Sequence, residues 1–358
     1  MTRMTGDSVS ELDDLAAPAM RRYDHIIEAV FGSVWAILPE KLYTIAEIVK
    51  MRARGITFSA EEIESRTGGR PARRPASRRG AIAVLPLYGV ISQRMNLMTA
   101  ISGGTSTEMF AAAFREVIAD DGIEAVVIDI DSPGGSVFGV QELAQEIFDA
   151  RGRKPIVAIA DSMAASAAYW IGTAAGEFVL TPSGMVGSIG VVSVHEDMSR
   201  NLEMEGFKIT LISAGKFKTE GNPYEPLGEE ARAYAQQMMN DYYGRFVDAV
   251  ARNRGVLSDA VRSGFGEGRM VTSADAVRMG MVDGIETLPQ LLARMGGRAE
   301  AVETTPPPTV PPIDGSTQSP LPPAAGPENA DGQRDRRVRL LDMELAARAA
   351  GRKGGGGE

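Results

Sequence analysis

The feature that most constrains the fold of this chain is an alternation of apolar strand-like runs with amphipathic helices. Apolar runs at residues 81–87, 123–130 and 156–160 are typical of buried strands. Between these runs, apolar residues recur at helical spacing over 109–118 and again over 140–148. Strands that alternate with such helices predict a parallel sheet covered by helices, so we expect an α/β core.

Two segments precede this core. Residues 1–65 predict a helical N-terminal region, because apolar residues recur at helical spacing in 26–34 and 43–54 and Ser59 opens a capping-box pattern. Residues 66–80 are rich in Arg, Gly and Pro and predict an exposed basic linker, which is open to cleavage. We therefore expect the N-terminal region to be separate from the core.

The core is expected to occupy residues 81–295, with a long helix over 228–254. Clustered prolines mark 296–330 as a linker without packed structure. Residues 331–358 mix arginines with apolar residues, a pattern that suits either a disordered tail or a short helix docked on a partner.

Composition excludes several classes of function. A net charge of −9 gives no reason to expect nucleic acid as a partner. The chain has no cysteine, and its two histidines, His25 and His195, are too few for a histidine-based metal cage, so we expect neither metal nor cofactor. No run reaches the ~20 apolar residues of a membrane helix, and the N-terminus lacks a secretory pattern. We expect a cytoplasmic protein without a membrane partner.

Ser166 is the candidate nucleophile. It follows the apolar run 156–160 and precedes an apolar helix, with Ala164, Ala165 and Ala167 around it. A strand, a tight turn and a helix place its hydroxyl beside unpaired backbone N–H groups at the positive end of the helix dipole. A helix cap or a packing residue is the alternative interpretation.

Two glycine-containing turns lie near this serine in the expected topology. In 131–135, the backbone N–H groups of Gly134 and Gly135 are free to point at a developing oxyanion. Residues 187–190 predict a turn into a strand along which a peptide can pair, and Ser188 offers a hydroxyl that can position a neighbour. Structural turns without a catalytic role remain the alternative for both.

A serine hydroxyl needs a base, and the candidates are a lysine or a histidine. Lysine acts as a base only where burial destabilises its ammonium group, and a lysine in a loop is usually solvated. Lys216 and Lys218 share one loop. His195, which follows an apolar run, is the alternative base.

Together and in this order, these segments resemble the S49 peptidase family, which comprises the signal peptide peptidase A enzymes and the phage head maturation proteases and has the ClpP/crotonase-like fold. The resemblance covers roughly residues 81–290. It rests on the motifs Asp131-Ser-Pro-Gly-Gly135, Ala164-Ala-Ser-Ala-Ala-Tyr169, Gly187-Ser-Ile-Gly-Val191, Gly215-x-x-Lys218, Gly268-Arg-Met-Val-Thr272, Ala274-Asp-Ala276 and Gly280-Met-Val-Asp283. Ala167-Ala168 stands where many relatives have Gly-Gly, which implies a narrower pocket.

The resemblance implies a serine endopeptidase with Ser166 as nucleophile and Lys218 as general base. Gly134 and Gly135 would form the oxyanion hole. A second segment would orient the base and bind substrate: Gly187, Ser188, Ile189 and Gly190. The family also forms rings in which neighbouring subunits complete the active site, so we expect a homo-oligomer.

The segments around the core favour the phage head maturation branch. The N-terminal region, with Trp35-Ala-Ile-Leu-Pro39, is similar to those proteins, and the chain shows no membrane tether. Scaffold, capsid or portal proteins and the chain itself would be the substrates, in the host cytoplasm or the assembling prohead. The alternatives are a bacterial cytosolic S49 peptidase, a crotonase-type acyl-CoA enzyme and a non-enzymatic capsid scaffold.

Overall fold

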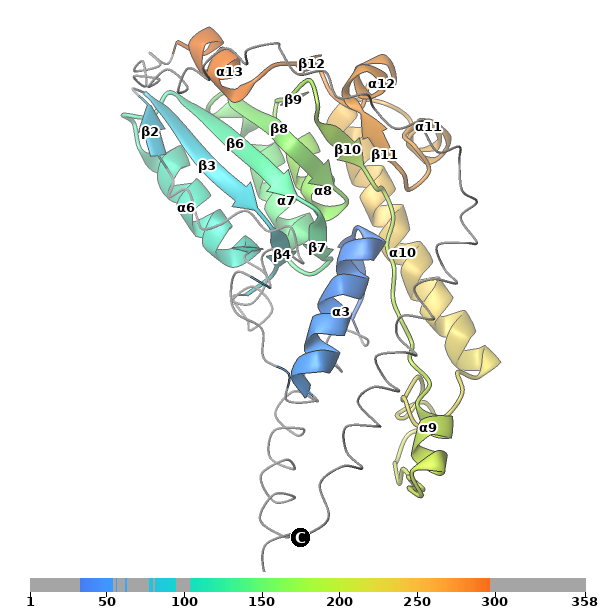
Figure 1. Ribbon diagram of the computed structural model, residues 1–358. Coiled ribbons are helices and arrows are strands. Elements are labelled where there is room, and N and C mark those ends of the chain that lie inside the picture. Colours follow the sequence, from blue (N-terminus) through green and yellow to red (C-terminus); the bar gives the residue numbers. More distant parts are fainter. Residues whose placement is uncertain are drawn as a thin grey trace, which may run out of the picture. The chain divides into compact units, whose positions relative to one another are not determined.

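The computed structural model describes residues 33–53, 56, 62, 77–79, 81–94 and 104–296 (Figure 1). The helical pattern before residue 33, the capping-box pattern at Ser59, the Pro-rich linker beyond Gly296 and the basic tail lie outside these residues. The described core has mixed α/β structure with parallel and antiparallel strands, which confirms the expected class. The ClpP/crotonase-like assignment remains a prediction.

An eight-stranded sheet forms the centre of the described part, with the strand order β11-β10-β8-β6-β3-β2 and with β9 joining β8 to β12 (Figure 1). Its strands are β2 Ser77–Arg79, β3 Ile82–Tyr88, β6 Ala125–Ser132, β8 Ile156–Ala165, β9 Glu177–Leu180, β10 Met185–Gly187, β11 Met270–Thr272 and β12 Gly284–Ile285. The pairs from β3 to β10 are parallel, and β2 and β11 add antiparallel edges. The three apolar runs that predicted buried strands are β3, β6 and β8.

A smaller sheet with the order β1-β7-β4-β5 adjoins this core. Its strands are β1 Trp35–Ile37, β4 Val90–Ser92, β5 Gly104–Ser106 and β7 Gly134–Ser136. Val34 and Ala36 are buried in the main apolar core. The N-terminal region is therefore not separate from the core, because its strand β1 pairs with β7. The helix expected over 43–54 is α3 Pro39–Ala53, which begins earlier because proline suits the first helical turn.

Two other segments differ from the sequence-based expectations. Within 66–80, β2 pairs antiparallel with β3, so the sheet begins before residue 81. Gly187 is the last residue of strand β10, and residues 188–190 form no strand of their own. The loop after α9 also contains an apolar run, 209–212, which is exposed and forms no strand.

Helices cover the sheet as the alternating pattern predicts (Figure 1). The helices that follow α3 in the described part are α6 Thr107–Ala119, α7 Val140–Asp149, η1 Ala150–Gly152, α8 Ala167–Thr173, α9 Ser199–Met204, α10 Glu229–Arg254, α11 Ser258–Gly264, α12 Ser273–Arg278 and α13 Leu288–Arg294. Of these, α9 lies away from the sheet (Figure 1) and has no buried residue. The long helix α10 matches the expected 228–254. None of the helices in the described ranges combines the length and apolar character needed to cross a bilayer.

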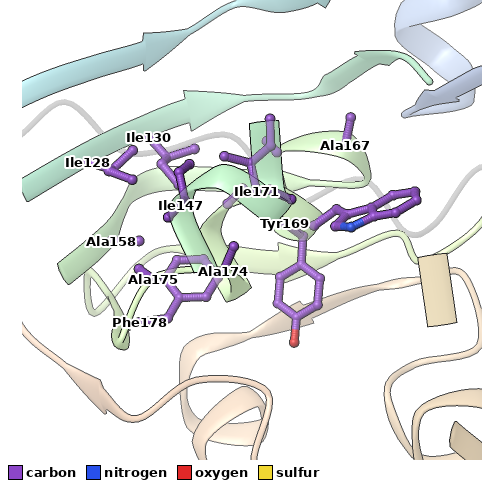
Figure 2. Close-up of a cluster of buried hydrophobic side chains, with 14 of the residues drawn as sticks. Ile128, Ile130, Ile147, Ala158, Ala167, Tyr169, Ile171, Ala174, Ala175 and Phe178 are labelled. Atoms are coloured by element: carbon purple, nitrogen blue, oxygen red, sulfur yellow. The ribbon is translucent and has the colours of Figure 1, made fainter. Parts of the chain in front are cut away.

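Helix α8 is the most deeply buried of these helices, since all seven of its residues are buried. The Trp170 ring stacks on the Phe246 ring of α10, with 4.7 Å between the ring centroids. The centroids of the Tyr169 ring and the Phe178 ring of β9 are 5.8 Å apart. Figure 2 shows Ile171 and Ala174 directed into a cluster with Ile147 of α7 and the isoleucines of β6. Packing on all sides fixes the position of the residue before the helix, Ser166.

The segment after α12 is tied to this region by polar contacts. The Tyr169 hydroxyl donates to the Met281 carbonyl at 2.9 Å, and Arg254 donates to Asp283 at 2.7 Å. Asp283 also accepts a 2.7 Å hydrogen bond from the Phe178 N–H. Burial opposes ionisation of this carboxyl, but the hydrogen bonds from Arg254 and Phe178 outweigh it and hold the pKa of Asp283 below its ordinary value.

We predict that Asp283→Asn lowers the free energy of unfolding at pH 7 by about 2 kcal/mol, since it leaves the largely buried Arg254 without its carboxylate. Because the folded-state pKa of Asp283 is depressed, this stabilisation is present at neutral pH and is lost as pH falls through that pKa. Urea unfolding at neutral and acid pH measures the effect. The matched control is Asp275→Asn, which breaks an exposed ion pair with Arg278 and should change stability by less than about 0.5 kcal/mol. If the free energies of unfolding of Asp283→Asn and the parent still differed in strong acid, the difference would not come from the ionised carboxylate of Asp283.

Candidate active site

The candidate residues gather at one edge of the large sheet because three neighbouring strands are parallel. Strands β6, β8 and β10 lie side by side in the order β6-β8-β10 and run in the same direction. Their carboxyl ends therefore meet at one edge, where ligand sites of parallel sheets usually form. The segments 133–136, 166–167 and 188–190 follow these ends directly.

Ser166 occupies a strained turn between β8 and α8. Its backbone has φ 56° and ψ −116°, a region that a residue with a side chain rarely adopts. Its N–H donates to the Gly187 carbonyl at 2.7 Å, and its carbonyl accepts from the Trp170 N–H at 3.0 Å. Such strain, about 1–3 kcal/mol, persists only where packing enforces it and is common at functional sites. The buried helix α8 provides that packing.

Gly134 lies directly against this turn. Its φ is +94°, and an added Cβ would lie 3.0 Å from the Ser166 Cβ, 2.9 Å from the Ala165 carbonyl oxygen and 2.2 Å from the Ala36 carbonyl oxygen. A side chain larger than hydrogen is thus excluded on two grounds. Its N–H donates to the Ser132 hydroxyl at 3.2 Å.

Gly135 faces a different neighbour. An added Cβ there would lie 1.9 Å from the Ile91 carbonyl oxygen, so Gly135 allows β7 to pack closely on β4. Of the two glycines expected near the nucleophile, Gly134 lies against Ser166, and Gly135 belongs to the pairing between strands.

The segment 187–190 covers the serine. The Ser166 hydroxyl donates to the Gly190 carbonyl at 3.3 Å, and Ser166 has no exposed surface. Gly187 and Ser188 both have positive φ, and the Ser188 N–H donates to the Arg269 carbonyl at 2.9 Å. Ile189 is buried in the main core and anchors the segment.

The candidate bases lie elsewhere in the described chain. Lys218 is exposed in the loop between α9 and α10, where its N–H donates to the Gly215 carbonyl at 3.1 Å. Lys216 forms an exposed ion pair with Glu230 at 3.0 Å. The His195 ring Nε2 is hydrogen-bonded to the Asn222 carbonyl at 3.0 Å. Figure 1 shows α9 and the loop after it, which carries Lys216 and Lys218, extending away from α8.

Within the described ranges, no three acidic or histidine side chains are grouped so that they could hold a metal ion. The chemistry available at this edge is a hydroxyl, a hydrogen-bond acceptor at Gly190 and backbone N–H groups of a glycine turn. This set of groups is compatible with covalent acyl transfer and includes no base.

Sequence reasoning missed one contributor, strand β1. Its Ala36 carbonyl points at Gly134 beside Ser166. The motif Trp35-Ala-Ile-Leu-Pro39 indicated only the resemblance to the phage proteins. It did not predict a strand, because three residues within a region of helical character give no periodic signal. Its partner lies about a hundred residues later, which no local pattern reveals.

Comparison with known proteins gives the chain its relatives. Residues 149–302 match the model of Peptidase family S49, which confirms the resemblance that the motifs predicted. The head-tail preconnector protein GP5 of Enterobacteria phage P21 is 33% identical over 255 residues, which are 67% of this chain and 51% of that protein. The capsid assembly protease C of Escherichia phage lambda is 31% identical over 202 residues, or 56% of this chain and 46% of that protein.

A third relative is the chloroplastic serine protease SPPA of Arabidopsis thaliana. It is 29% identical over 219 residues, or 60% of this chain and 29% of that protein. The chain spans about half the length of the two phage relatives.

We predict that Gly134→Ala lowers the free energy of unfolding by at least about 2 kcal/mol, because the methyl group meets two carbonyl oxygens and the backbone has positive φ. Gly244→Ala is the matched control. Gly244 lies within α10 with open space around its Cβ direction, so alanine there should raise stability by about 0.5–1 kcal/mol. Chemical denaturation compares the two variants, and equal effects would refute the close approach at Gly134.

Proposed function

We propose that this S49 peptidase-family chain is a serine endopeptidase with Ser166 as its nucleophile. The observation that carries the proposal is the turn of Ser166: a buried serine at a strained strand-to-helix junction, at the carboxyl edge of parallel strands, with Gly134 against it. A hydroxyl held in this way is fixed relative to any carbonyl placed beside the glycine.

The reaction proceeds by acyl transfer. The Ser166 Oγ attacks the peptide carbonyl carbon as a base removes the hydroxyl proton, and the carbonyl oxygen gains negative charge. The tetrahedral intermediate collapses with loss of the amine, which takes the proton, and water then hydrolyses the acyl-enzyme. Backbone N–H groups of Gly134 and Gly135 are the proposed oxyanion donors, which requires that the Gly134 N–H leave the Ser132 hydroxyl and that the Gly135 N–H leave its partner in β1.

Lys218 is the proposed general base, on the strength of the S49 resemblance and of its motif Gly215-x-x-Lys218. Its loop is exposed in one chain, so the proposal requires that assembly of a homo-oligomer brings Lys218 to a Ser166, with Ser188 orienting the amine. Burial at such an interface would also favour the unprotonated amine that a base requires.

The proposed substrates are proteins of an assembling phage prohead, namely scaffold, capsid or portal proteins and the chain itself. Support comes from the names of the phage relatives, one of which is a capsid assembly protease. The proposed reaction involves no nucleic acid, membrane or cofactor. We propose that it takes place in the host cytoplasm or inside the prohead. Incubation with candidate scaffold and capsid proteins, followed by mass spectrometry of the fragments, identifies the cleaved bonds.

We predict that Ser166→Ala and Lys218→Ala each reduce peptide cleavage by at least about a thousandfold. Lys216→Ala, His25→Ala and His195→Ala should retain most of the activity, since Lys216 already pairs with Glu230 and His195 with Asn222. Because a lysine base must be unprotonated, cleavage by the parent should rise toward alkaline pH. If Lys218→Ala retained full activity and His195→Ala were inactive, the general base would be His195 and not Lys218.

We predict that the active form is a homo-oligomer. The segment after α9 exposes a group of large apolar side chains, which is typical of an interaction surface: Phe207, Ile209, Leu211, Ile212 and Phe217. Ile212→Asp should shift the mass measured by light scattering toward one chain and lower cleavage in parallel, because Ile212 is 96% exposed and contributes little to the fold of a single chain. Leu257→Asp is the control, since Leu257 is 79% exposed outside this segment. A monomeric parent that cleaves peptide would exclude the assembly.

A further inference from the structure

Strand β1 lies between two segments of the candidate site. On one side it pairs antiparallel with β7, in the register Trp35↔Ser136, Ala36↔Gly135 and Ile37↔Gly134. On the other side it forms an antiparallel bridge to Val192, just beyond the 187–190 segment. We call the space between β7 and Val192 the slot, and β1 fills it.

The backbone of β1 is hydrogen-bonded on both sides. The Leu38 N–H donates to Pro133 at 3.0 Å, and the Val34 carbonyl accepts from Val137 at 3.3 Å, both toward β7. Since backbone groups in an antiparallel ladder alternate, Ala36 also faces β7 and Trp35 faces the other way. Trp35 and Val192 exchange two hydrogen bonds of 2.9 and 2.8 Å.

The centre of β1 lies at the nucleophile. The Ala36 carbonyl oxygen and the Ser166 Cβ approach the same point, the position of the missing Cβ of Gly134, at 2.2 and 3.0 Å. The proposed oxyanion strand is therefore already paired with a peptide carbonyl. With β1 on one side and Gly190 on the other, Ser166 has no exposed surface and no substrate can reach it.

A protease that binds an extended peptide holds it in this manner, by main-chain hydrogen bonds along a free strand edge. We propose that β1 is a resident pseudosubstrate: it occupies the slot in which a substrate strand must bind, and the described chain is a latent form. This inference rests on the proposed function for its catalytic meaning. It also gives the class of ligand, an extended segment with an aromatic residue, a small residue and a β-branched residue in succession.

The small residue follows from the burial of Ala36, which has no exposed surface in the main core. Trp35 and Ile37 point instead to a second apolar cluster, shared with Leu42 and Ile45 of α3. An ion pair between Lys50 and Glu196 adds to the same contact. The pseudosubstrate is thus retained by the docking of α3, and its release requires that this cluster separate.

A reversible disulfide tests the proposal. The chain has no cysteine, so Trp35→Cys with Val192→Cys introduces one pair at the bridge. Hydrogen-bonded antiparallel partners have Cα atoms about 5.5 Å apart, within the range of a disulfide. The pair is made in full-length Ser166→Ala protein, so that binding is read without cleavage. The probe is a fluorescein-labelled peptide with the sequence of residues 33–39, followed by anisotropy.

The reduced protein should bind this peptide at least tenfold more tightly than the oxidised protein, and about as tightly as the Trp35→Cys single variant. The Ser166→Ala chain without cysteines should bind the peptide more weakly than the chain that also carries Trp35→Cys, because its intact β1 competes with the peptide. A peptide with phenylalanine at the Ala36 position should lose at least tenfold in affinity. Val192→Cys alone should show no response to oxidation.

Equal binding by the oxidised and reduced forms would overturn the inference, since the peptide would bind outside the slot. Absence of binding to both, in proteins with the circular dichroism of the parent, would also overturn it, because β1 would then be a permanent part of the sheet. Failure of the proposed function has a different signature. There, Ser166→Ala would cleave as well as the parent, whatever the peptide-binding result.

Discussion

The absence of a side chain at Gly134 is the constraint on which the candidate site depends. Carbonyl oxygens from β1 and β8 and the Cβ of Ser166 converge on the space that a Cβ would fill. These segments can approach so closely here because Gly134 has no side chain. Gly134 also adopts positive φ in the turn from β6 into β7. This turn therefore packs directly against the turn of Ser166 that leads into α8.

The strain at Ser166 is maintained by apolar packing on the opposite side of the turn. Helix α8 has Trp170 against α10 and Tyr169 against β9, so it cannot move to relax the backbone before it. The contact of Tyr169 with Met281, and of Arg254 with Asp283, extends this support to the segment after α12. Residues distant from the hydroxyl thus determine its geometry.

Much of this arrangement could be predicted from local patterns. The runs that became β3, β6 and β8 are long and apolar, and the stripes that became α6 and α7 have clear helical spacing. Parallel order then places Gly134, Ser166 and Gly187 at one edge. The pairing of β1 could not be predicted, because three residues carry no period and the partner strand β7 is equally short. The structure shows Lys218 exposed, as a lysine in a loop usually is, and a sequence motif alone does not tell which group stands beside such a lysine.

The position of β1 ahead of β2 in the same chain determines how the proposed latency would end. A segment that is covalently attached meets its slot at an effective concentration of roughly millimolar order, which a free peptide at micromolar concentration cannot match. One hydrolysed bond in residues 54–76, which include most of the Arg-, Gly- and Pro-rich stretch, would convert this unimolecular equilibrium into a bimolecular one. Occupancy would then depend on dilution. Inside a closed shell of small volume the detached segment stays concentrated, whereas in open solution it is lost.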